Sequence, residues 1–267
     1  MNEVFSFGSY YPGDSPLHKC DARTKLTLGF VFLIVALMAQ GFAGLGVIAV
    51  FVAFLYVVSR IPFGKAMRSL APLMAIALIC ALLNLFVDQS GETLLKWGII
   101  EISTGSVHSC LFVGCRIILM MMGMSLITMT TTTLDLTAAV EQMLHPFARF
   151  GVPAHELGMI MGIALRFMPQ FATELANVYH AQISRGAALD GSPVKGLRML
   201  SSVTIPLFAS VFRHAETLSA AMDARCYHGG PGRTRLKPLH YTALDRNAVI
   251  VLAIMFAVVF ATNFIPL

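Results

Sequence analysis

Long runs of uncharged, mostly apolar residues organise the chain. Residues 26–59 contain no charged side chain, and as one helix they would extend about 51 Å, well beyond the ~30 Å hydrocarbon core of a membrane. A turn signal, Gln40-Gly41-Phe42-Ala43-Gly44, interrupts this run. The pattern therefore predicts a tight hairpin of two membrane spans, over 26–40 and 43–59.

Three further runs predict three more spans, over 69–87, about 109–130, and 247–267. Each is close to the ~20 residues that a transmembrane helix needs. Arg116 lies inside the fourth span, where an arginine costs at least ~2.5 kcal/mol at mid-bilayer. Two interpretations of Arg116 stay open. Either it lies near the outer interface and snorkels, meeting Glu101 or Asp88, or it makes a structural ion pair or a partner contact inside the bundle.

The region between the fourth and fifth spans is amphipathic rather than uniformly apolar. Its uncharged stretches, 157–165 and 199–212, are too short to cross a membrane. We expect long helices at or below the membrane surface, with prolines that bend them. The expected helices are 135–150 closed by Gly151, Pro153 to Gly186 with a bend at Pro169, and Pro193 to Cys226 with a bend at Pro206.

The fold class predicted is thus all-α, a polytopic membrane protein with about five transmembrane helices plus long helices outside the membrane. Hydrophobic residues make up 57% of the chain and charged residues only 12%, against roughly a quarter charged in soluble domains. The predicted parts are an arm over 1–25, four spans over 26–130, a helical region over 131–246, and a C-terminal span over 247–267.

Basic residues predict the orientation. They gather in the arm, in the loop after the second span, and in 131–246, whereas the loop before the fourth span has Lys96 alone against three acids. By the positive-inside rule, the first three segments face the cytoplasm and the C-terminus lies outside. The net charge of +5 therefore suits membrane orientation better than nucleic-acid binding.

No pattern in the sequence predicts catalysis, a metal or a cofactor. His155-Glu156 begins like a zinc-protease motif, but Met159 stands where the second histidine is needed. The chain has no phosphate-binding Gly-x-x-x-x-Gly-Lys-Ser/Thr loop, and its five cysteines are unclustered. An enzyme would need converging acid, base or metal residues, and the few acids are spread out.

Two helix ends carry the most specific pattern. Ala-x-x-x-Arg occurs as Ala181 to Arg185 and again as Ala221 to Arg225, and glycine follows at Gly186 and at Gly229-Gly230. Glycine after a helix is typical of a left-handed helix stop. The sequence thus predicts two arginines at two helix tips, where a cytoplasmic partner could bind them.

Several segments, in order along nearly the whole chain, resemble the transmembrane coupling (T) subunit of energy-coupling-factor transporters. The similarity has two departures: Cys20 and Ala22 stand where the family has Leu and Pro, and Cys226 replaces a glycine, so that Gly229-Gly230 is expected to stop that helix. The segments are 7–25, Leu165-Arg166-Phe167-Met168-Pro169, Ser184-Arg185-Gly186, Ala221-Met222-Asp223-Ala224-Arg225-Cys226-Tyr227 and Gly229-Gly230-Pro231-Gly232-Arg233-Thr234.

The resemblance implies a non-catalytic scaffold of an importer in a prokaryotic cell membrane, without cofactor or metal. Its partners would be two ABC-type ATPases, a separate substrate-binding (S) membrane subunit and the lipid bilayer, and its cargo vitamins or similar micronutrients. The 131–246 region would hold the coupling helices. The resemblance assigns Ser184, Arg185 and Gly186 to one ATPase and Ala224, Arg225 and Cys226 to the other, without saying which arginine binds which.

Alternatives remain at this stage. The two arginines could simply cap their own helices. The chain could also be a membrane-embedded enzyme, or a self-sufficient permease, which would need paired polar residues across several spans where Arg116 alone qualifies.

Overall fold

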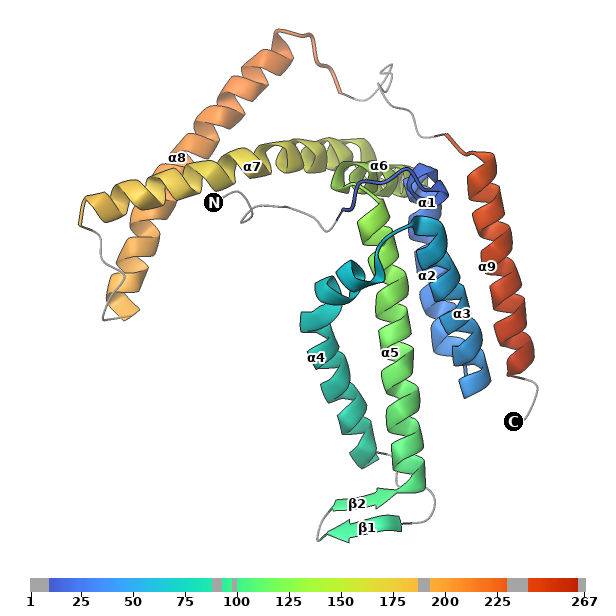
Figure 1. The fold of residues 1–267 in the computed structure, drawn as a ribbon. Helices are drawn as coiled ribbons and strands as arrows, with labels where there is room; N and C mark the ends of the chain where they lie inside the picture. The colour runs from blue at the N-terminus through green and yellow to red at the C-terminus, as the bar shows by residue number, and fades with distance from the viewer. Residues whose placement is uncertain (1–9, 88–92, 98–99, 187–192, 230–239, 264–267) are drawn as a thin grey trace. The chain divides into compact units, whose positions relative to one another are not determined.

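A computed structural model describes residues 10–87, 93–97, 100–186, 193–229 and 240–263 (Figure 1). The chain divides into two compact units, one built on Gly8–Ala139 with Lys237–Leu267 and the other on Val140–Leu236. Residues 1–9 of the predicted arm, part of the loop after the third span, and most of the Gly229–Thr234 motif lie outside the described residues.

The first unit is a helical bundle. Four of the described helices are long and apolar enough to cross a membrane: α3, α4, α5 and α9. The first predicted span corresponds to α2, whose 17 residues extend about 26 Å. The all-α polytopic class is therefore confirmed. The bounds are α1 Pro16–Lys19, α2 Ala22–Met38, α3 Phe42–Ser59, α4 Phe63–Val87, α5 Thr104–Thr130 and α9 Ala243–Thr262.

The predicted hairpin is confirmed, since α2 ends at Met38 and α3 begins at Phe42 after the N-cap Gly41. One feature was not predicted. A short antiparallel pair, β1 Thr93–Trp97 and β2 Ile100–Ser103, lies between α4 and α5. It is too short to change the fold class, and its two strands pair only with each other among the described residues.

Several helices begin upstream of the uncharged runs. The third, fourth and fifth spans were expected from 69, 109 and 247, but α4, α5 and α9 begin at Phe63, Thr104 and Ala243. Polar caps explain the last two. The side chains of Ser103 and Ser106 form a capping box at the start of α5, as those of Thr242 and Asp245 do at α9.

The core of the bundle lies between α2, α3, α5 and α9. Tyr56 of α3 donates a hydrogen bond from its hydroxyl to the carbonyl of Met122 on α5, at 3.2 Å. A side chain at Gly123 would collide with the ring of Phe32, and one at Gly29 with Ile127. These glycines therefore let α2 and α5 pack closely, as small residues do in membrane bundles.

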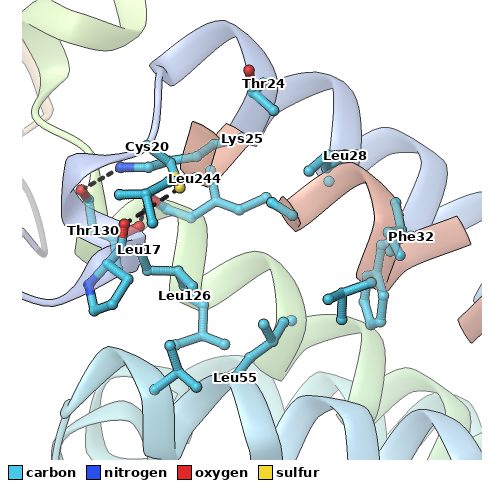
Figure 2. A pocket seen from close by; sticks show the side chains of 18 of the residues that line it. Leu17, Cys20, Thr24, Lys25, Leu28, Phe32, Leu55, Leu126, Thr130 and Leu244 are labelled. Atoms are coloured by element: carbon cyan, nitrogen blue, oxygen red, sulfur yellow. Dashed lines mark hydrogen bonds between the residues drawn. The ribbon is translucent and has the colours of Figure 1, made fainter. Parts of the chain in front are cut away.

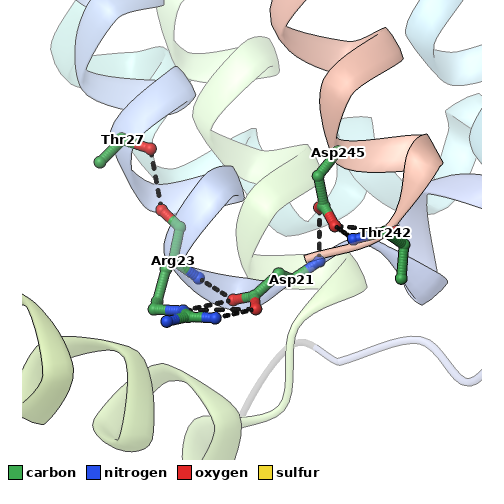
Figure 3. Close-up of polar contacts among 5 residues, drawn as sticks. All are labelled: Asp21, Arg23, Thr27, Thr242 and Asp245. Carbon is green, nitrogen blue, oxygen red and sulfur yellow. Dashed lines mark hydrogen bonds and ion pairs between the residues drawn. The ribbon is translucent and has the colours of Figure 1, made fainter. Parts of the chain in front are cut away.

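A polar network ties the arm to the ends of α2 and α9 (Figure 3). Asp21 caps α2 and pairs with Arg23 at 2.7 Å, while its backbone N–H donates to Asp245 at 2.8 Å. Asp245 also accepts from the Thr242 backbone N–H at 2.7 Å. Because Asp21 and Asp245 are buried, these hydrogen bonds fix the two helix starts against each other.

The second unit contains the long helices of the amphipathic region. The expected helix 135–150 is wrong in its second half. α6, Thr133–Leu144, gives way to a 3₁₀ segment, η1, His145–Phe150, because Pro146 lacks the N–H that an α-helix needs there. Gly151 closes the segment at φ 86°, as predicted. The remaining helices are α7 Ala154–Ser184 and α8 Pro193–Asp223.

Pro169 and Pro206 lie inside α7 and α8, where each removes a backbone hydrogen bond. The two helices cross each other (Figure 1). α6 packs on α7 through Gly158, where a side chain would collide with Glu141. Four residues further along α7, Gly162 faces open space and makes no such contact.

Candidate functional site: the two arginine helix ends

The first arginine lies at the C-terminal end of α7. Arg185 is the C-cap residue, and its backbone N–H bonds to the carbonyls of Ala181 and Gln182. Gly186 follows in the left-handed conformation, φ 86°, and donates to Ile183 at 2.9 Å. Ser184 donates its hydroxyl to the carbonyl of His180. This end is therefore terminated by glycine in the way the sequence predicts.

The second arginine lies at the corresponding place after α8. Cys226 adopts the left-handed conformation, φ 55°, and donates to Asp223 at 2.9 Å, while Tyr227 donates to Met222 at 3.1 Å. This pair of bonds is a Schellman motif with Arg225 as C-cap. The expectation that Gly229-Gly230 stops this helix is wrong, because Cys226 itself takes the glycine position.

The two ends thus have the same backbone design, Arg at the C-cap and a left-handed residue next. Both arginine side chains are exposed. Among the described residues, neither guanidinium forms an ion pair or a hydrogen bond. They do not bond to the last carbonyls of their own helices, which argues against the reading of the arginines as simple caps. Each exposed guanidinium is a planar group whose N–H donors can bind a carboxylate through two hydrogen bonds.

A polar cluster fastens α7 to α8 at their crossing. Ser210 donates to Glu174, and His214 lies 3.5 Å from the same carboxylate. The rings of Phe167 and Phe171 lie about 6 Å from the His214 ring, at 6.3 and 6.1 Å. Sequence reasoning missed this cluster, because Glu174 and His214 are 40 positions apart and match no motif.

The two arginine ends lie at equal distances along their helices from the crossing of α7 and α8. Arg185 follows Glu174 by eleven residues, and Arg225 follows His214 by eleven, so each end lies about 16 Å along its helix from the crossing.

α8 also exposes large apolar side chains. Five residues of α8 are 58–70% exposed within the chain. Exposed apolar patches mark interaction surfaces. The five are Leu197, Leu200, Ile205, Phe208 and Phe212.

Arg116 lies in α5 and contacts the bundle itself. Its guanidinium donates to the carbonyl of Ala39, the C-cap of α2, and lies 4.5 Å from the ring centre of Phe112. The side chains of Asp88 and Glu101 are outside the described set. Arg116 thus satisfies a helix-end carbonyl of the α2–α3 turn, a contact that does not decide between the two interpretations.

His155 contacts Glu141 at 3.2 Å rather than a second histidine. In the described ranges, no group of three or more His, Cys, Asp or Glu side chains is placed to hold a metal ion. Two acids of the helical unit, Glu141 and Glu174, each lie beside a histidine of another segment.

The apolar helices define the class, an integral, polytopic membrane protein. The sequence profile of the cobalt transport protein family, CbiQ, matches residues 13–236. The chain is 39% identical to the energy-coupling factor transporter transmembrane protein EcfT of Thermosediminibacter oceani, over 94% of both chains. It is 37% identical to EcfT of Clostridium kluyveri over 92% of both, and 32% to that of Bacillus subtilis over 97% of this chain and 98% of the relative.

The chain therefore belongs to the EcfT family of energy-coupling factor transporter transmembrane proteins, and the predicted resemblance is confirmed. These relatives are named as transport components rather than enzymes, in line with the expectation of a non-catalytic chain. A transmembrane component implies a complex with partner subunits.

Proposed function

We propose that this chain is the non-catalytic scaffold that couples two ABC-type ATPases to a substrate-binding S subunit in an energy-coupling-factor importer. The single observation that carries the proposal is the paired design of the α7 and α8 ends. Each offers an exposed arginine without an intrachain partner among the described residues. An arginine left free at a rigid helix tip is suited to a carboxylate in a groove on another protein.

In this proposal Ser184, Arg185 and Gly186 dock on one ATPase, and Ala224, Arg225 and Cys226 on the other. The exposed apolar residues of α8 would contact the S subunit. The clustering of Lys and Arg residues in the arm and in the helical unit supports a cytoplasmic location for both. The cargo is a vitamin or a similar micronutrient, and Co²⁺ uptake is the comparison assay, since the family profile is described as cobalt transport.

Assembly tests the docking directly. The chain is co-expressed with candidate ATPases and the complex is recovered through a tag on this chain. Arg185→Glu or Arg225→Glu should reduce the ATPase recovered, since breaking a buried charge pair costs about 2–5 kcal/mol. Arg213→Glu is the matched control, because Arg213 is also exposed on α8 but lies away from its end. Equal recovery from all three variants would contradict the docking role.

A further inference from the structure

An elongated apolar cavity lies in the helical bundle, between α1, α2, α3, α5 and α9 (Figure 2). Its volume is about 250 Å³, and a dry apolar cavity of about 150 Å³ already binds small apolar molecules. Leucines from each of these helices form much of its wall: Leu17, Leu28, Leu55, Leu126 and Leu244.

The cavity is long in the direction of the helices. It is lined from Thr24 to Phe32 on α2 and from Leu244 to Leu252 on α9. Eight residues of helix correspond to about 12 Å. Because the long axis follows two helices of the bundle, the cavity suits a narrow, extended apolar chain lying along the membrane spans.

Lys25 lies at one end of the cavity. Its ammonium donates to the carbonyls of Thr130 at 3.0 Å and His18 at 3.3 Å. An ammonium has three donors, and the third has no acceptor among the described residues. Across the described part of the chain, Lys25 has no carboxylate in an ion pair, and a buried cation without an anion is unfavourable.

The opposite end is apolar. Phe32 and Gly123 lie there, and Phe51 closes the wall beside them. The cavity therefore has one cationic end and one apolar end. This polarity matches an anionic amphiphile rather than a wholly apolar molecule or a soluble anion.

We propose that the cavity binds one acyl chain of an anionic membrane phospholipid, with the lipid phosphate at Lys25. The surrounding solvent of these helices is the bilayer itself, so phospholipid is the ligand at highest concentration. Basic pockets between transmembrane helices bind anionic headgroups. This inference uses the bundle alone and does not depend on the docking of Arg185 or Arg225.

The test quantifies phospholipid that stays bound to the full-length chain after extraction in mild detergent, by native mass spectrometry. Ala248→Phe places a ring in the cavity, because Ala248 lines it and is half-buried. Ala253→Phe is the matched control, an exposed alanine of the same helix that does not line the cavity. Ala248→Phe should abolish retention of the lipid, and Ala253→Phe should leave it unchanged.

A second pair of variants tests the headgroup. Lys25→Gln should weaken binding of anionic phospholipid about ten-fold, the loss expected for one charged hydrogen bond, while Lys19→Gln, at an exposed lysine, should not. If Lys25→Gln fails to fold, Lys25→Arg should retain the lipid and Ala248→Phe still decides the acyl site. Equal retention in Ala248→Phe and Ala253→Phe, or bound zwitterionic lipid or free fatty acid in place of anionic phospholipid, would overturn the proposal.

Discussion

At the residue scale, Cys226 holds a backbone conformation that usually belongs to glycine. A left-handed conformation costs a residue with a side chain roughly 1–2 kcal/mol. The helix end nevertheless keeps both Schellman bonds, from Cys226 to Asp223 and from Tyr227 to Met222. The second arginine end therefore carries a conformational free-energy cost. The first end avoids this cost, because a glycine, Gly186, takes the left-handed position there.

Replacing Cys226 with glycine should therefore increase the stability of this helix end. Cys226→Gly is expected to stabilise the α8 end by about 1 kcal/mol and to leave assembly and transport near normal, as measured by thermal unfolding of the purified chain and by uptake. Gly186→Ala is the reciprocal control and should destabilise by a similar amount. A large loss of transport in Cys226→Gly would show that the thiol has a specific role.

At the element scale, the crossing of α7 and α8 is fastened by side chains from both helices. Glu174 accepts from Ser210 and lies beside His214. If the contact between Glu174 and Ser210 fixes the angle between α7 and α8, the effects of Glu174→Ala and Ser210→Ala on the free energy of unfolding are not additive. Residues that share a contact show interaction energies of about 0.5–3 kcal/mol.

A double-mutant cycle with Glu174→Ala and Ser210→Ala measures this energy from unfolding of the purified chain. We expect a favourable coupling within that range, together with reduced stimulation of the partner ATPases in the double variant. Glu216→Ala with Ser210→Ala is the control cycle, since Glu216 is exposed on α8, and it should give no coupling. Additive effects in the first cycle would exclude a fastened crossing.

The sequence predicted these elements in part. Uncharged runs locate the apolar body of each span. The starts of α5 and α9 depend instead on the polar capping residues Ser103, Thr242 and Asp245, and a search for apolar runs places such residues outside the span. The arginine ends were predicted because Ala-x-x-x-Arg before glycine is a local signal. The Glu174 cluster and the Asp21–Asp245 bond, between residues 224 positions apart, needed the tertiary structure.

At the scale of the whole molecule, coupling to cytoplasmic ATPases needs the arm and the helical unit on the cytoplasmic side of the membrane. The charge distribution predicts this orientation, with Lys96 of β1 outside and Lys195 of α8 inside. In this orientation the proposed ATPases would bind from the cytoplasm and the proposed S subunit within the membrane.

A membrane-impermeant amine reagent on intact cells tests the orientation. It should label Lys96 and leave Lys195 unlabelled, with opened membranes as the control in which both react. Labelling of Lys195 from outside would overturn the five-span arrangement and make the long helices of the second unit true spans.

The central claim is that Arg185 and Arg225 couple ATP hydrolysis to uptake. The most direct measurement is substrate uptake together with ATPase activity in the reconstituted complex. Single Glu variants should reduce uptake severely, and Arg185→Glu with Arg225→Glu should abolish it while the chain remains folded in the membrane. Lysine at both positions should restore uptake only partly, because an ammonium lacks the planar fork. Normal uptake by the double Glu variant would contradict the account.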